Sequence, residues 1–581
     1  MISHHGLLLT GLLAWPALGN AAVRAHTRSC RCLPTEECWP SPAEWAHFNS
    51  SVDGSLIQTT PLGTPCHAPS YDADVCDEFR EEWNVPEIHY QSSSSVMAPW
   101  FANGSCDPFH PIPKPCTLGN YISYAVNVSH PGHISRALAF VTAHNLRLVI
   151  RNTGHDYQGK STGAGALGVW THHLKDIQIH PHHQDAHYTG PAATLGAGVQ
   201  AFEAYQAADD HGYQIVGGEC PTVGIAGGYT QGGGHSALSS RYGLAADQVL
   251  KWEVIDGAGN FLTATRDNEH SDLFWALSGG GGGTYGVVWS MTSKLHASTP
   301  TSGLNLTFTN ANISQDTFYE AVTLFHSHLP TIVDAGVMSI FALTNTTFGI
   351  TPLTGPGIPV AELESLIQPF RDDLDTLGIA HTMHTGQFDT YLDQFEAMMI
   401  DVPVGIAQYG GWLIPRSVVR ENNAALTDAC RQITENGGYF VGVGLNVAKG
   451  PGEVYNAVLP AWRDALIHTV LSTPWEWDNG HEMLVNQYKM THEFVSLLER
   501  LAPRSGAYLN EGDFLQPNFQ QAFYGENYPR LRRVKAKYDP NDIFYAWTGV
   551  GSDEWVGDDA DGRLCRAGGH DLVSQEGYGY Y

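Results

Sequence analysis

The chain has 581 residues, more than one hydrophobic core normally serves, so we expect two or three domains. Its 30 Lys and Arg residues against 59 Asp and Glu residues give a formal net charge of −29. A charge of this sign repels nucleic-acid phosphates and anionic membranes, so we expect neither as a partner.

The first 22 residues, MISHHGLLLTGLLAWPALGNAA, hold an apolar run as long as a signal-peptide core and too short to span a bilayer. Small residues follow the run, and we predict a signal peptide over residues 1–21. No later apolar run reaches 18 residues, so we expect no membrane anchor. Six N-x-S/T sequons agree with a secreted glycoprotein: Asn49, Asn103, Asn127, Asn305, Asn312 and Asn345.

The cysteines are unevenly distributed, and seven of the ten precede residue 117: Cys30, Cys32, Cys38, Cys66, Cys76, Cys106 and Cys116. We predict a disulfide-stapled N-terminal extension over residues 22–116. If Cys565 folds back onto it, eight cysteines form four disulfides, and Cys220 and Cys430 lie outside them. Cys430 sits in a helical pattern, where a lone cysteine is usually a small buried hydrophobe.

After residue 117 the patterns alternate between helix and strand. Residues 133–145 show helical spacing and run into an apolar strand at 146–152. A second helix is predicted at 202–212, with strands at 213–218 and 247–256. Strands that alternate with helices and end in glycine-rich turns are typical of a ligand-binding domain.

From about residue 300 to 500 the helical patterns lengthen, as at 359–378, and strands such as 404–415 lie between them. These longer helices with strands between them predict a second, α+β domain. Beyond residue 505 the sequence is again rich in Gly, Asn and Pro.

Two glycine-rich runs carry nucleophilic side chains. RNTGHDYQGKSTGAGALG follows the strand at 146–152 and holds His155, and GGECPTVGIAGGYTQGGGHS starts at residue 217 and holds Cys220. Glycines let backbone N–H groups approach an anion closely. The first run lacks the G-x-G-x-x-G and helix start of a Rossmann fingerprint, which disfavours an ordinary NAD domain. Each run alone could be a simple turn, but the pair is more specific.

Other motifs fail on inspection. GHSALS has Leu238 where a nucleophile elbow needs glycine, and HEMLV has Val485 where a zincin helix needs its second histidine. Six histidines lie between residues 172 and 187, where a metal site is conceivable. Strand alternation would point them to different faces, so we interpret them as a solvated surface and expect no metal site.

With these runs in view, the sequence resembles the vanillyl-alcohol-oxidase superfamily, in particular the secreted fungal type of the berberine bridge enzyme-like branch. The branch motif R-x-x-G-H-x-Y-x-G matches residues 151–159, and C-P-T-V-G-x-x-G-G-x-x-x-G-G-G matches residues 220–234. Residues 241–247, Tyr508-Leu-Asn510 and residues 537–544 also match. The resemblance covers roughly residues 117–300 and 505–550.

The resemblance implies an α+β fold. A PCMH-type FAD-binding domain at 117–300 would be completed by residues 505–581. A substrate domain at 301–504, an antiparallel sheet covered by helices, would be inserted between them.

The resemblance also implies bicovalent FAD, with the 8α-methyl on His155 and flavin C6 on the sulfur of Cys220. A thiolate is the competent nucleophile for the second bond. Both bonds would keep the cofactor on the protein and favour hydride acceptance. The cofactor-binding residues it implies are Arg151, Asn152, Thr153, Gly154, His155, Asp156, Gly159, Gly163, Gly217, Cys220, Gly224, Gly227, Gly228, Gly234 and Asn510.

The catalytic base is less clear, because the family often has tyrosine directly after Tyr-x-Asn and this chain has Glu511. Glu511 is our first candidate base and Tyr157 the second; the plain alternative is that Glu511 is a solvated loop carboxylate. Burial beside a flavin could raise the pKa of a glutamate. Asn510 would orient the flavin or the substrate.

Val223, three residues after Cys220, is the residue that in this family faces oxygen, and valine there accompanies oxidase behaviour. We therefore expect a secreted, monomeric FAD oxidase that takes a hydride from a small-molecule alcohol, such as a carbohydrate or a phenolic, and reduces O2 to H2O2. Three alternatives stay open: a bicovalent flavin dehydrogenase with a quinone or protein acceptor, an oxidative-cyclisation enzyme of secondary metabolism, and a non-catalytic flavoprotein.

Overall fold

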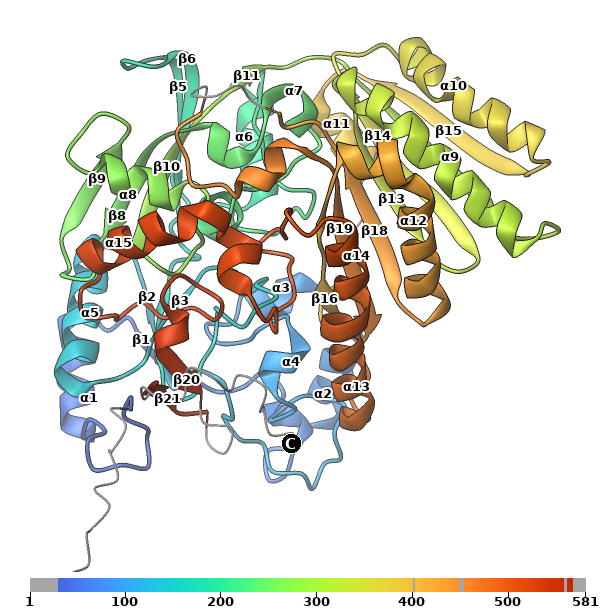
Figure 1. Ribbon diagram of the computed structural model, residues 1–581. Coiled ribbons are helices and arrows are strands. Elements are labelled where there is room, and N and C mark those ends of the chain that lie inside the picture. Colours follow the sequence, from blue (N-terminus) through green and yellow to red (C-terminus); the bar gives the residue numbers. More distant parts are fainter. Residues whose placement is uncertain (1–29, 401–402, 449–453, 558–561, 568–581) are drawn as a thin grey trace, which may run out of the picture.

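The computed structural model describes residues 30–400, 403–448, 454–557 and 562–567. The predicted signal peptide at 1–21 lies outside the described residues. Among the helices within these ranges, none is both long and apolar enough to cross a membrane. In Figure 1 the yellow and orange middle of the chain lies beside a part built from the blue, green and red segments.

The first sheet has four strands in the order β1-β2-β4-β3. They are β1 (Leu56–Gln58), β2 (Tyr124–Asn127), β3 (Leu148–Arg151) and β4 (Leu167–Trp170). β4 pairs in parallel with β2 and β3, and it is buried along its whole length, as apolar parallel strands usually are. The strand predicted at 146–152 is β3.

Helix α5 (Pro131–His144) connects β2 to β3 and confirms the helix predicted there. Pro131 takes the first helical position, where a missing N–H costs nothing. Asn145 ends the helix in the left-handed conformation, with a φ of 51°. The helix therefore delivers the chain to β3 and to the glycine-rich loop that follows β3.

The second sheet is antiparallel, in the order β5-β6-β10-β8-β9. Its strands are β5 (Ile177–Gln184), β6 (Thr189–Gly196), β8 (Val249–Ile255), β9 (Phe261–Thr265) and β10 (Val287–Lys294). Helices α6 (Ala201–Asp209) and α8 (Ser271–Leu277) contact it. The strand predicted at 213–218 is only two residues long, β7 (Tyr213–Gln214), paired with β11 (His296–Ala297), because the chain then enters the second glycine-rich loop.

The third sheet has eight antiparallel strands, in the order β15-β12-β14-β13-β18-β19-β16, with β17 also paired to β19. Its strands are β12 (Thr301–Thr309), β13 (Met338–Leu343), β14 (Thr347–Pro356), β15 (His381–Phe388), β16 (Ala407–Gly410), β17 (Leu413–Pro415), β18 (Tyr439–Gly444) and β19 (Ala465–Pro474).

Three long helices cover one face of this sheet (Figure 1). They are α9 (Gln315–Asp334), α10 (Val360–Thr376) and α12 (Arg416–Glu435). In α10 the buried residues Leu363, Ile367, Phe370 and Leu374 recur at helical spacing, so one stripe of the helix meets the sheet. Shorter helices are α11 (Tyr391–Met398), α13 (Gly480–Lys489) and α14 (Val495–Leu501). The predicted α+β class, with an antiparallel sheet covered by helices, is confirmed.

The N-terminal segment contains α1 (Pro42–Ser51), α2 (Ala73–Glu82), α3 (Pro86–Tyr90) and α4 (Pro99–Ala102). It is not a detached appendage, since its strand β1 pairs with β2. Its cysteines form four disulfides, Cys30–Cys565, Cys32–Cys38, Cys66–Cys76 and Cys106–Cys116. The expectation that Cys565 folds back is confirmed, and the two remaining cysteines are thiols.

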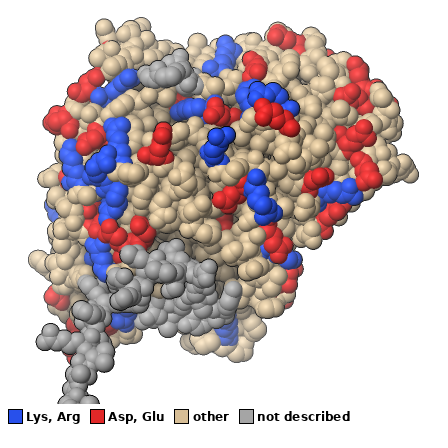
Figure 2. Space-filling model, in the orientation of Figure 1, with Lys and Arg blue, Asp and Glu red and all other residues tan. Residues whose placement is uncertain are grey.

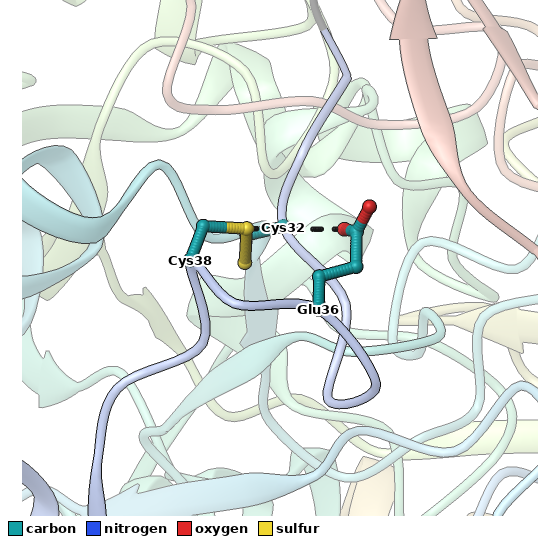
Figure 3. A group of neighbouring side chains, drawn as sticks. All are labelled: Cys32, Glu36 and Cys38. Atoms are coloured by element: carbon teal, nitrogen blue, oxygen red, sulfur yellow. Dashed lines mark hydrogen bonds between the residues drawn. A yellow bond between two sulfur atoms is a disulfide. The ribbon is translucent and has the colours of Figure 1, made fainter.

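Figure 3 shows Glu36 beside the Cys32–Cys38 bridge. Its carboxylate accepts from the Leu33 backbone N–H at 2.8 Å and from Arg563 Nη1 at 2.9 Å. Both sulfurs are bonded to each other, so neither is a thiolate that could bind a metal. This group is a structural staple between the two ends of the described chain.

The C-terminal segment returns to the first sheet. Helix α15 (Tyr528–Tyr538) packs on α8, and Phe544 forms a parallel bridge with Leu148 of β3. Buried Lys535 pairs with buried Asp539 and donates to the carbonyl oxygens of Thr284 and Phe544. The last described strands are β20 (Trp555–Gly557) and β21 (Leu564–Arg566).

Candidate active site

Arg151 closes β3 and is fully buried. Its Nη2 donates to the carbonyl oxygens of His89 at 2.7 Å and Ser92 at 2.8 Å, both in the N-terminal segment. Nε and Nη1 have no hydrogen-bond partner, and burial lowers the pKa of this guanidinium to about 9. Gly154 has a φ of 92°, and a Cβ there would collide with Arg151, so the loop needs glycine at this position.

Asp156 holds the loop that carries His155 and Tyr157. Its Oδ1 accepts the backbone N–H groups of Gln158 at 3.0 Å and Lys160 at 2.8 Å. Its Oδ2 lies 2.6 Å from Lys160 Nζ. Its role in the structure is therefore to fix the turn.

The second glycine-rich loop packs on the first through Asn152. A Cβ at Gly224 or Gly227 would run into the Asn152 amide, whose Nδ2 donates to the carbonyl oxygen of Ala197 at 2.6 Å. Gly227 and Gly228 lie in a short π-helical turn, Ile225–Tyr229, a form often found at functional sites. A Cβ at exposed Gly228 would meet no atom within 4 Å.

The two nucleophilic side chains converge on one hydroxyl. His155 Nε2 lies 2.7 Å from Thr222 Oγ1, and Cys220 Sγ lies 3.7 Å from the same oxygen. Burial, with the charges of His89 and Arg151, lowers the pKa of His155 to about 3. The imidazole is therefore neutral near pH 7 and keeps a nucleophilic ring nitrogen.

These residues fit a flavin. Two nucleophiles lie near each other, both in contact with the Thr222 hydroxyl, and attachment at two positions of one ring requires two nucleophiles close together. Buried polar atoms next to them lack partners, namely Arg151 Nε and Nη1 and Asn152 Oδ1. Such atoms are costly to leave unsatisfied, and a polar ligand would satisfy them. His155 and Cys220 would hold the cofactor, and the Gly228 turn leaves open space beside the loop.

Four other predicted glycines have their side-chain position filled by protein. A Cβ would collide with Phe101 at Gly159, Arg147 at Gly163, Tyr205 at Gly217, and Tyr229 at Gly234. Packing alone thus explains glycine at these positions, and only their backbone could face a ligand. Thr153, the remaining predicted residue of the first loop, is buried.

Glu511 lies between two histidines. Its carboxylate oxygens are each 3.2 Å from His235 Nε2, and Oε2 is 2.6 Å from His468 Nε2. On the other side of His235, Glu219 Oε2 lies 3.2 Å from Nδ1. Both histidines are buried, whereas the Glu511 side chain is 24% exposed, so Glu511 is the most accessible of the three central groups.

The two histidines of this cluster have pKa values shifted in opposite directions. The cluster consists of Glu219, His235, His468 and Glu511. Burial alone would lower the pKa of His235, but the charges of Glu219 and Glu511 outweigh it and raise that pKa well above its usual value. Burial lowers the pKa of His468. Burial would raise the pKa of Glu511, but His235 and His468 together lower it. The cluster thus holds an imidazolium, a neutral histidine and an ionised Glu511, contrary to the raised pKa considered from the sequence.

Tyr157 and Tyr409 stack beside this cluster, with ring centroids 4.0 Å apart. Burial raises the pKa of Tyr157 far above 10, and the neighbouring Tyr409, Glu511 and Cys220 raise it further. Tyr157 is therefore a neutral phenol and a poor base. This electrostatic coupling also places Glu511 and Cys220 around the same tyrosine.

Asn510 and Val223 complete the predicted set. Asn510 Nδ2 donates to the carbonyl oxygen of Gly228 at 3.0 Å and to Tyr508 Oη at 2.7 Å, which ties the C-terminal segment to the second loop. Val223 is half-buried, directly after Thr222. The structure therefore brings both loops and Asn510-Glu511 together.

Sequence reasoning missed three neighbours: Glu219, His235 and His468. Glu219 and His235 lie inside the run that was singled out for Cys220, so the signal was present. His468 is a lone histidine in the apolar strand β19. Without knowledge of its partner Glu511, the sequence favours a core histidine there.

The histidine run lies before, on and just after β5. His172 is buried against Trp170 and Tyr90, which corrects part of the solvated-surface interpretation, whereas His182 and His187 are exposed. Within the described residues these histidines do not gather into a metal-binding group.

Two family models match the chain. The model described as FAD binding domain matches residues 122–265, and the model described as berberine and berberine like matches residues 507–551. They cover both glycine-rich loops and the segment that carries Asn510 and Glu511.

Relatives match over nearly their whole length. The FAD-linked oxidoreductase patO of Penicillium expansum is 48% identical over 93% of this chain and 95% of its own. The bifunctional decalin synthase calF of Penicillium decumbens is 40% identical over 97% of this chain and 100% of its own. The crystal structure of the VAO-type flavoprotein MtVAO615 from Myceliophthora thermophila is 42% identical, with a TM-score of 0.89 over 93% of this chain and 100% of that one.

Proposed function

Because the chain belongs to the FAD-linked oxidoreductases of the vanillyl-alcohol-oxidase superfamily, berberine bridge enzyme-like branch, we propose that it is a bicovalent FAD oxidase that acts on an alcohol. The donor's CH–OH group would become a carbonyl group while one O2 becomes one H2O2, which takes up the two hydrogens that the donor loses. The donor class, a carbohydrate, phenolic or other alcohol, and the oxygen acceptor are parts of this proposal.

The observation that carries the proposal is the convergence of His155 and Cys220 on Thr222, with Glu511 close enough to the stacked Tyr157 and Tyr409 to raise the pKa of Tyr157. His155 and Cys220 would hold FAD, which when bound accepts a hydride and returns electrons to an acceptor. The donor would then lie between the cofactor loops and the Glu511 cluster.

Glu511 would bind the donor hydroxyl. Its carboxylate is ionised, fixed by two histidines and partly exposed, so it can accept a hydrogen bond from an alcohol. A lowered pKa makes Glu511 alone a weak base. The cluster as a whole holds two carboxylates and one imidazolium, a net charge of −1, so uptake of the donor's proton would neutralise it. Neutralisation is favourable in a buried site, which supports proton acceptance by the cluster.

Val223 supports the oxidase assignment. It is half-buried next to the Cys220 turn, and its side chain is the smaller of the alternatives that the family uses at this position. A small apolar side chain leaves room for O2 there.

Oxidative cyclisation is a second candidate, because a 40% identical relative has the printed name bifunctional decalin synthase. A dehydrogenase with a quinone or protein acceptor is the third. An oxygen electrode, read beside reduction of a dye, separates oxidase from dehydrogenase, and product analysis identifies a cyclised product.

We also propose that the protein is secreted, glycosylated and monomeric. Four disulfides agree with an oxidising compartment. Three of the six sequon asparagines, Asn103, Asn312 and Asn345, are exposed, so they are the expected glycan sites. N-terminal sequencing of protein from culture medium should find cleavage near residue 21.

The test is an oxygen-consumption screen over alcohol donors, repeated with Glu511→Gln. General acid–base groups contribute about 10²–10⁴-fold, so we expect the variant to lose about 100-fold or more in kcat with its FAD content unchanged. Glu482→Gln is the matched control, because Glu482 is half-buried like Glu511 and lies outside the cluster, and it should behave as wild type. The proposal is refuted if Glu511→Gln turns over at the wild-type rate, or if none of the donors in the screen leads to oxygen uptake.

A further inference from the structure

Two histidines and one carboxylate form an inward-facing triad around Glu511, and this arrangement goes beyond what donor binding requires. His235, His468 and Glu511 each direct one ligand atom toward the others, all within 4.8 Å. We propose that this triad binds one divalent transition-metal ion of the zinc class. The proposal revises the expectation, drawn from sequence, that the chain has no metal site.

The spacing of Glu511 from each histidine is near that of two ligands on a tetrahedral ion. Ligand atoms about 2.0–2.2 Å from a tetrahedral zinc lie about 3.3–3.5 Å apart. Both Glu511 oxygens lie 3.2 Å from His235 Nε2, close to that value. His468 Nε2 lies 2.6 Å from Glu511 Oε2, so an entering ion needs that pair to separate by less than about 1 Å.

A second carboxylate, that of Glu219, lies next to one histidine of the triad. Histidines that bind metals usually present their other ring nitrogen to a carboxylate or carbonyl, which fixes the ring. Glu219 Oε2 lies 3.2 Å from His235 Nδ1, the nitrogen on the side away from Glu511. The Tyr229 hydroxyl donates to the His235 carbonyl oxygen at 2.6 Å, and His468 is fixed in strand β19. The backbone of both histidines is thus held before an ion arrives.

The donor set selects the class of ion. Two imidazoles and one carboxylate match three-ligand zinc sites, in which water takes the fourth position, whereas Mg²⁺ and Ca²⁺ prefer oxygen ligands. Zinc binding would release the proton of the His235 imidazolium, because only a neutral imidazole binds a metal. The two carboxylates, Glu219 and Glu511, would then match the charge of one divalent ion. In the same described residues the other His, Cys and carboxylate group, Cys32, Glu36 and Cys38, is closed by its disulfide (Figure 3).

A bound ion would occupy the carboxylate that we assign to the donor hydroxyl. Zinc should therefore inhibit donor oxidation, a consequence that rests on the proposed function. Zinc binding itself does not rest on the proposed function, so the zinc site and the proposed function can fail separately. Zinc can bind to an enzyme whose donor chemistry differs from the proposal.

The experiment measures zinc per chain by elemental analysis, using untagged FAD-loaded protein that is dialysed after incubation with Zn²⁺. Because the histidines on β5 and just after it can hold zinc weakly, the background variant is His183→Gln/His187→Gln. We expect it to keep one zinc per chain, and His235→Gln, His468→Gln and Glu511→Gln, each made in it, to keep none. Glu219→Gln should weaken affinity about 10–100-fold. Mg²⁺ and Ca²⁺ should not compete.

X-ray absorption at the zinc edge tests the site in wild-type protein, so a variant that fails to fold cannot hide the answer. The proposal predicts a first shell of nitrogen and oxygen with imidazole scattering. Sulfur in that shell would assign the zinc to a cysteine and overturn the proposal. So would zinc retention that is unchanged in folded Glu511→Gln, or no retained zinc in the background variant.

Discussion

Thr222 is the residue that connects the two candidate attachment points. Its hydroxyl lies 2.7 Å from His155 Nε2 and 3.7 Å from Cys220 Sγ, and the Thr222 carbonyl oxygen accepts from Gln200 Nε2 at 2.8 Å. If the Nε2 proton is donated to Thr222, the lone pair of His155 lies on Nδ1. Thr222 would therefore act as a positioning residue that selects the nucleophilic nitrogen.

We expect Thr222→Val to lower the fraction of chains that carry FAD through both bonds, and Thr222→Ser to keep it. A neutral hydrogen bond contributes about 0.5–1.5 kcal/mol, so the loss should be partial. Intact-mass analysis of denatured protein, with and without cleavage between the two loops, gives the fraction at each bond. Wild-type occupancy of both bonds in Thr222→Val would show that the hydroxyl has no part in attachment.

Val223→Ile tests the oxygen side. One added methylene should slow oxygen consumption more than dye reduction by the same donor, because only the reaction with oxygen needs the space. The free energy of unfolding should fall by no more than about 1–3 kcal/mol, since Val223 is half-buried. Equal slowing of both reactions would mean that Val223 is ordinary packing. If wild type itself reduces dye but not oxygen, the dehydrogenase alternative holds.

At this scale the sequence identified the nucleophiles but not their surroundings. His155, Cys220 and Glu511 lie in motifs that can be quoted from the chain. The ionisation of Glu511 could not be read from it, because the pKa depends on His468, 43 residues earlier on another strand. Burial alone suggested a raised pKa, and two histidines reversed the direction.

At the scale of elements, periodicity predicted the long helices and the buried strands well. α5 and α10 each present an apolar stripe at helical spacing, and β3 is an apolar run. It overestimated the length of β7, which was predicted at 213–218 and is only Tyr213–Gln214, because the backbone then enters the glycine-rich loop. The cysteines predicted a stapled N-terminal extension. Periodicity could not predict that its strand β1 pairs with β2 across 65 residues of intervening chain.

The disulfide framework gives an element-scale prediction. Thiol labelling of denatured, non-reduced, FAD-loaded protein should modify one cysteine, Cys430 of α12. Cys430 is buried and burial raises the pKa of its thiol, so native protein should not be labelled there. Peptide mapping locates the label. Three or more labelled cysteines would contradict the four disulfides.

At the scale of the whole molecule, the site is a meeting point of distant chain segments. Gln158 in the first loop donates to the carbonyl oxygen of Gly512 at 3.2 Å and accepts from Thr548 Oγ1 at 2.6 Å. β19 brings His468 from the third sheet. Motifs could predict that these segments matter, but not that they touch, since contact follows from the packing of three sheets.

Charge at this scale agrees with a small-molecule donor. The net charge is −29, and Figure 2 shows acidic and basic side chains next to one another on the drawn face. Ion pairs such as Arg416–Asp334 bring opposite charges together. The negative net charge is expected to repel nucleic-acid phosphates, which stays a prediction.

The central claim is that His155 and Cys220 each hold the cofactor covalently. Purified protein is denatured in acid, digested, and its flavin-containing peptides are identified by mass spectrometry. The account predicts that the yellow colour stays with the chain and that one FAD joins the peptide of His155 to the peptide of Cys220. His155→Ala and Cys220→Ala should each leave one bond. Complete release of FAD from the denatured wild-type protein would contradict the account.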